Sequence, residues 1–85
     1  MKDLTTKDID KIKNTIPEEV GDNIRKMREE KGLTQTELAN KILSDRQYLY
    51  KIETGKVGLS VVKLAVIATA LGVEITDLLD FSSKK

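Results

Sequence analysis

The stretch from Thr34 to Gly55 constrains the fold of this 85-residue chain more than any other segment. Its sequence is TQTELANKILSDRQYLYKIETG, and its apolar residues fall into two short runs, each with helical spacing. The first run comprises Leu38, Ala39 and Ile42, and the second comprises Leu49 and Ile52. The pattern predicts two short helices, and their few apolar residues require that they pack against further helices.

Helix start signals precede both runs. Thr34 and Glu37 have the spacing of a capping box, and Asp45 is a good N-cap because its carboxylate accepts from free backbone N–H groups. A tight turn at Leu43-Ser44 is therefore expected between the helices. The second helix carries polar side chains of the kinds that contact base edges and phosphates, namely Arg46, Gln47, Tyr48, Tyr50 and Lys51.

The rest of the chain also shows helical spacing. Thr6 is expected to cap a short helix that ends near Asn14, because Pro17 disfavours helix in the residue before it. Pro17 would open the next helix, which Gly32 ends. Downstream, Ser60 and Thr76 are expected to cap the fourth and fifth helices. We therefore predict an all-α, compact five-helix bundle containing a helix-turn-helix, with a short N-terminal helical extension.

Three ordered segments resemble the phage-repressor (Cro-type) helix-turn-helix family of bacterial regulators. IRKMREEKGLTQTELA resembles the family's first two helices, DRQYLYKIETGK its recognition helix, and SVVKLAVIATALGVEITDLL its last two helices. The similarity runs from about Val20 to about Phe81 and implies residues 19–81 as a DNA-binding domain, residues 1–18 as an extension, and 82–85 as a disordered tail. The extension either covers part of the core or acts as a partner-binding or dimer arm.

One departure from the family lies in the turn. The family usually has Gly followed by an apolar residue, whereas this chain has Leu43 and Ser44. Gly suits the left-handed conformation after a helix, and Leu is strained there. Either Leu43 accepts that strain, or the turn is reshaped so that Leu43 fills a core position.

The resemblance implies roles for individual residues. Arg46 and Gln47 would contact bases, while Lys51 suits either a base or a phosphate. Arg28 and Glu53 would form a partly buried ion pair between the first and third helices, unless they are unrelated surface charges. Contacts with the DNA backbone are expected from Thr34, Gln35, Tyr48, Tyr50, Thr54, Gly55 and Lys56. A dimer interface is expected from Ile75, Leu78, Leu79 and Phe81, unless these residues only close the monomer core.

Composition narrows the function classes. The chain has no Cys and no His, so disulfides, thiolate or imidazole metal sites and the commonest catalytic bases are absent. Neither an enzyme, a metal nor a cofactor is expected. Without a signal peptide or an apolar stretch of membrane-spanning length, we expect a cytoplasmic protein.

The charge distribution favours double-stranded DNA as the partner. The net charge is only +1, but residues 25–63 contain nine Lys or Arg and five Asp or Glu, a net charge of +4. Random scatter in a highly charged protein is the alternative. The predicted function is a homodimeric, sequence-specific transcriptional regulator, such as a phage-type repressor or a restriction–modification controller. The alternative is an antitoxin or another protein-interaction module with the same fold.

Overall fold

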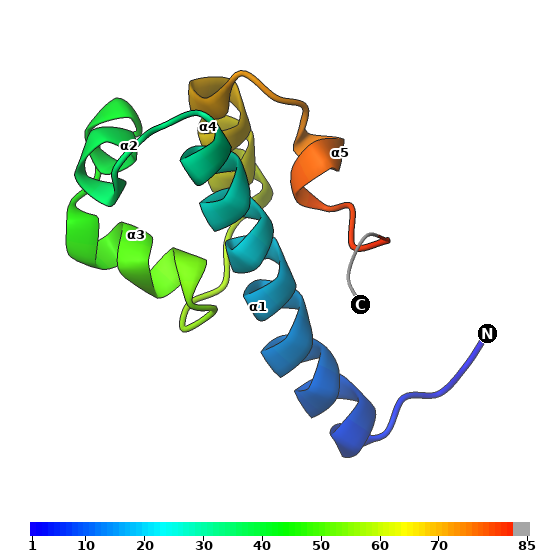
Figure 1. Ribbon diagram of the computed structural model, residues 1–85. Coiled ribbons are helices and arrows are strands. Elements are labelled where there is room, and N and C mark those ends of the chain that lie inside the picture. Colours follow the sequence, from blue (N-terminus) through cyan, green and yellow to red (C-terminus); the bar gives the residue numbers. More distant parts are fainter. Residues whose placement is uncertain (83–85) are drawn as a thin grey trace.

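The computed structural model describes residues 1–82, and these form five α-helices with no strand (Figure 1). The all-α helix-turn-helix fold predicted from the sequence is confirmed. Apart from Ser82, the expected tail lies outside the described residues. The helices are α1 (Thr6–Glu30), α2 (Gln35–Lys41), α3 (Arg46–Glu53), α4 (Val61–Leu71) and α5 (Ile75–Leu78).

The core is formed by buried residues of the carboxyl half of α1 and of the other four helices. Each of the two apolar runs noted in the sequence faces this core, so α2 and α3 are held by packing rather than by their own helix propensity. The largest fully buried side chains of the core are Ile24, Leu38, Leu49, Ile52, Ile67 and Leu78.

The expected break at Pro17 is wrong. A single 25-residue helix, α1, runs through Pro17, so the N-terminal extension continues directly into the first helix of the domain. Pro17 removes one backbone donor, but Val20, one turn later, is buried in the core, and Ile16 and Val20 line the same apolar groove. Local propensity is a weak guide where packing favours continuation.

The helix starts are partly as predicted. The N-caps Thr34, Asp45 and Ser60 are confirmed, each accepting a hydrogen bond from the backbone N–H three residues later. Two predicted caps are wrong. Helix α1 begins one residue early, with Thr5 as its N-cap, and α5 begins after Glu74 rather than Thr76. In both cases an Asp three residues after the actual cap completes a capping box.

The turn between α2 and α3 resolves the alternatives for Leu43. This residue has φ = 57°, in the left-handed region, and its side chain is 94% exposed. It therefore accepts the backbone strain and does not fill a core position. The next residue, Ser44, donates its N–H to the carbonyl of Ala39 at 2.8 Å, which closes the end of α2.

Two residues that the sequence analysis did not single out fix α1 against α3 and α5. A Cβ at Gly21 would overlap the carbonyl oxygen of Ile52 and lie 2.8 Å from that of Glu53, so α1 and α3 approach backbone to backbone. Buried Asn23 donates from its side-chain amide to the carbonyls of Leu78 and Asp80, at 3.1 and 3.0 Å. These contacts set the position of α3 relative to α1 and hold the end of α5.

Candidate DNA-binding surface

The outer face of α3 carries the side chains expected to contact bases. Arg46, Gln47 and Lys51 are exposed, and with Tyr50 they line one shallow hollow of about 430 Å³. Asp45 fixes the start of the helix because its carboxylate accepts from the Tyr48 N–H at 2.7 Å. The opposite face, with Leu49 and Ile52, is buried. The amphipathic sequence of α3 therefore presents its polar residues outward as one group.

The residues expected to contact the DNA backbone lie at the edges of this face, but several also have structural roles. Thr34 caps α2, and Thr54 is the C-cap of α3 and donates its hydroxyl to the carbonyl of Tyr50 at 2.8 Å. Tyr48 is half-buried, and the ammonium of Lys63 lies 5.5 Å from its ring centroid. Gly55 adopts φ = 75°, which turns the chain out of α3 and leaves Lys56 exposed.

Arg28 and Glu53 meet beneath this surface. The guanidinium donates twice to the carboxylate, at 2.7 and 3.0 Å, and a third time to the carbonyl of Leu33 at 2.8 Å. Both side chains are buried, and the hydrogen bond to Glu53 raises the pKa of Arg28 above its usual value. Because Glu53 is the last residue of α3, the pair ties that helix to α1.

Gln35 connects this buried pair to the outer face. Its amide nitrogen donates to Glu53 at 3.0 Å, and its amide oxygen accepts from Arg46 at 3.2 Å. A carboxylate can only accept, so Glu53 fixes which end of the Gln35 amide points outward. The outward oxygen then suits a donor such as Arg46. From the sequence, Gln35 is predicted to contact a phosphate; the structure adds that it lies in a polar chain that runs from Arg28 through Glu53 to Arg46.

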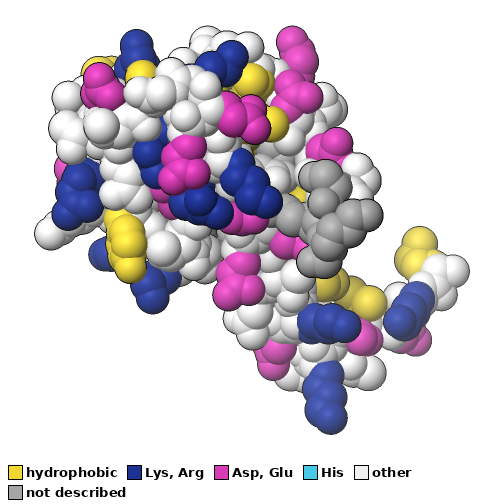
Figure 2. Space-filling view, in the orientation of Figure 1, with side chains coloured by type: hydrophobic (Ala, Val, Ile, Leu, Met, Phe, Trp, Pro, Cys, Tyr) yellow, Lys and Arg dark blue, Asp and Glu magenta, His cyan; other side chains and the backbone are white. Residues whose placement is uncertain are grey.

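Basic and acidic side chains gather on different parts of the surface. Figure 2 shows Lys and Arg side chains gathered over the α3 side of the molecule, whereas Asp and Glu are more numerous over α5. Arg46 makes its hydrogen bond to the neutral amide of Gln35 rather than to an acid. The positive charge on α3 is thus available to an external anion.

Other classes of site find little support within residues 1–82. No group of three or more acidic residues could hold a metal ion there, and every buried side-chain N or O atom has a hydrogen-bond partner. Over the same residues, no helix has the length and apolar character needed to cross a membrane.

Comparison with known proteins agrees with this geometry. Residues 24–78, from the last two turns of α1 to the end of α5, match the helix-turn-helix family. The chain belongs to this family. Its matched segment includes Arg28, α2, α3 and Glu53, which are the elements that build the candidate surface. The protein is accordingly a non-enzymatic, DNA-binding helix-turn-helix transcriptional regulator of the phage-repressor (Cro) type.

Similar proteins include two restriction–modification controllers. The control protein C.MunI of a Mycoplasma species is 38% identical over 66 residues, which are 76% of this chain and 89% of that protein. The crystal structure of the controller C.AhdI from Aeromonas hydrophila superposes with a TM-score of 0.70 at 35% identity, covering 73% of this chain and 94% of that one. SinR, a master regulator of biofilm formation solved in complex with DNA, superposes with a TM-score of 0.67 at 34% identity. That match covers 72% of this helix-turn-helix protein and 98% of the SinR chain in that structure.

Proposed function

We propose that this protein binds one preferred duplex sequence by placing α3 in the major groove. The observation that carries the proposal is the outer face of α3, where Arg46, Gln47 and Lys51 share one hollow. Arg and Lys donate to guanine O6 and N7, and the Gln amide matches adenine N6 and N7. Lys56 and the exposed start of α2 flank this face and suit phosphates.

Two single substitutions separate base reading from phosphate contact. Arg46→Ala should cost about 1–3 kcal/mol on the preferred site and relax the base preference there. Lys56→Ala should weaken binding to all duplexes alike and lower the slope of log K against log salt by about one. Fluorescence anisotropy across a salt series measures both effects. Equal losses on preferred and scrambled duplexes for Arg46→Ala would contradict base reading by this residue.

Gln35 should act on base preference through Arg46. Gln35→Leu removes the acceptor that holds the guanidinium, so the base preference attributed to Arg46 should weaken, with a coupling of about 1 kcal/mol between the two positions. In an Arg46→Ala background the same change should have little further effect on that preference. A double-mutant cycle on DNA affinity is the measurement. If Gln35 served only as a phosphate contact, its loss would be additive and independent of sequence.

The operator is inferred to be two-fold related and bound by a homodimer. One short recognition helix contacts only a few base pairs, and a second copy about one helical turn away, roughly 34 Å, supplies the remaining specificity. Of the four residues expected at the interface, Leu79 is exposed and Ile75 and Phe81 are half-buried. Leu78 must be removed from that set, because its side chain is fully buried in the monomer core.

A further inference from the structure

Lys63 belongs to α4, but its side chain reaches the turn that precedes α3. Its ammonium donates to the hydroxyl of Ser44, with 3.4 Å between Nζ and Oγ, and lies 5.5 Å from the centroid of the Tyr48 ring. Ser44 lies in the turn between α2 and α3, and Tyr48 lies in the first turn of α3. A positive charge from another helix is therefore held beside the amino-terminal end of α3.

The groups that contact this ammonium are neutral. None of the ion pairs found among residues 1–82 includes Lys63. Asp45, the residue after Ser44, caps α3, and its carboxylate accepts from the Tyr48 N–H at 2.7 Å. A Lys ammonium can donate several hydrogen bonds, whereas a hydroxyl accepts one of them and an aromatic ring offers only its π face. Lys63 therefore keeps both its full charge and donors for an external anion.

Backbone contacts fix both sides of the contact between Ser44 and Lys63. The Ser44 N–H donates to the carbonyl of Ala39 at 2.8 Å, which closes the end of α2. The Lys63 N–H donates to the hydroxyl of Ser60, the N-cap of α4, at 3.0 Å. Because the half-buried Lys63 side chain is also held by the Tyr48 ring, binding an anion there orders little that is not already ordered.

We propose that Lys63 binds a backbone phosphate of duplex DNA, and that Ser44 and Tyr48 position its ammonium. The proposal rests on the placement of α3 in the major groove proposed above. At about 1.5 Å per residue, the eight residues of α3 span about 12 Å, close to the width of that groove. Lys63 lies at the amino-terminal end of α3, and Lys56 lies beyond its carboxyl-terminal end. The two cations can therefore contact phosphates on the opposite strands that border the groove.

Lys63→Met tests the proposal, because Met keeps most of the apolar stem and removes only the charged end. On a duplex of random sequence, the variant should lower the slope of log K against log salt by about one for each bound chain. The advantage of wild type over the variant should then shrink about 3- to 4-fold between about 50 and 200 mM salt. Lys63→Arg keeps a cation and should retain the wild-type slope. Fluorescence anisotropy gives the slopes, thermal melts check folding, and Lys63→Gln repeats the test if Met destabilises the fold.

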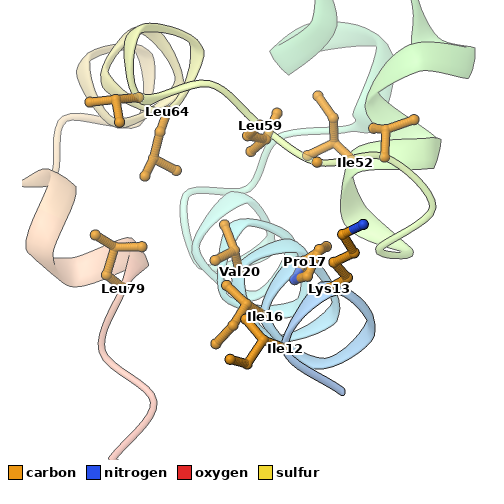
Figure 3. A pocket seen from close by; sticks show the side chains of 12 residues that line it. Ile12, Lys13, Ile16, Pro17, Val20, Ile52, Leu59, Leu64 and Leu79 are labelled. Carbon is orange, nitrogen blue, oxygen red and sulfur yellow. The ribbon is translucent and has the colours of Figure 1, made fainter. Parts of the chain in front are cut away.

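Lys11→Met is the matched control, because it removes the same charge from an exposed site. Lys11 lies on the amino-terminal part of α1, which projects away from α2 and α3 (Figure 1). Its neighbours Ile12 and Ile16 face Leu79 across an apolar groove, a surface unlike the polar one around Ser44 (Figure 3). At this distance from α3 the charge is screened by salt, so Lys11→Met should keep the wild-type slope.

The outcomes separate a phosphate contact from the other roles of Lys63. A wild-type slope for Lys63→Met overturns the proposal, since Lys63 would then only hold α4 against the turn. Equal decreases for Lys63→Met and Lys11→Met also overturn it, because the effect would follow net charge. Base reading is judged separately by Arg46→Ala. If wild type prefers no sequence but Lys63→Met still lowers the slope, the phosphate contact stands and base reading by α3 fails.

Discussion

Glu53→Leu is expected to lower the free energy of unfolding by about 3–5 kcal/mol. The Glu53 side chain is 1% exposed and accepts from Arg28 and Gln35, so its loss leaves a guanidinium in a buried site without its counter-charge. Arg28→Met should cost a similar amount for the converse reason. Since small domains have free energies of unfolding of about 5–15 kcal/mol, either change should remove a large part of the stability of the fold. Chemical denaturation followed by circular dichroism measures the loss.

The double variant Arg28→Met/Glu53→Leu isolates the pair. It should lose at least about 2 kcal/mol less than the two single changes combined, because no isolated charge remains buried. The exposed pair Arg25–Glu29, at 3.1 Å, provides the control cycle and should show a coupling of about 0–1 kcal/mol. A coupling for Arg28–Glu53 as small as that of the exposed pair would show that the buried pair does not tie α1 to α3.

Gly21→Ala should destabilise the fold although Ala favours helix. The added methyl overlaps the Ile52 carbonyl on α3, and neither backbone can yield without moving a whole helix. Overpacking of this kind lowers the free energy of unfolding by about 3 kcal/mol, whereas the higher helix propensity of Ala raises it by about 1 kcal/mol. We expect a net loss of about 2 kcal/mol, together with weaker DNA binding because α3 is displaced. Thermal melts and anisotropy give the two readings.

Gly58→Ala is the matched control for Gly21. Its Cβ would meet no atom within 4 Å, and Gly58 is not among the glycines with positive φ. Its stability should stay within about 0.5 kcal/mol of wild type. If Gly21→Ala proves as stable as this control, the backbone contact between α1 and α3 does not limit the fold.

Features with a local cause were predictable from the sequence. The helix starts were predictable because each N-cap hydrogen bond reaches only three residues along the chain, as at Thr34, Asp45 and Ser60. The Thr34 cap is reinforced by Glu37. The apolar spacing of α2 and α3 likewise identifies their buried faces. The polar face of α3 follows once the buried face is known. For Arg28 and Glu53, which the structure brings together across 25 residues, the resemblance to known repressors supplied the pairing.

The remaining features depend on partners distant in sequence. Pro17 suggested a break because local rules do not include the packing of the helical residues that follow it. In the sequence, Gly21 and Asn23 look like ordinary helical residues. Their roles depend on contacts with Ile52, Leu78 and Asp80, which lie far away in the sequence. The role of Gln35 needed the positions of both Glu53 and Arg46, which no local pattern provides.

Selection from a pool of random duplexes, run in parallel with wild type and Arg46→Ala, tests base reading by α3 most directly. Wild type should enrich a two-fold-related sequence with half-sites about one helical turn apart. Arg46→Ala should enrich the same arrangement with relaxed preference at one position in each half-site. Failure of the wild type to enrich any motif, or an identical motif from both proteins, would contradict the account.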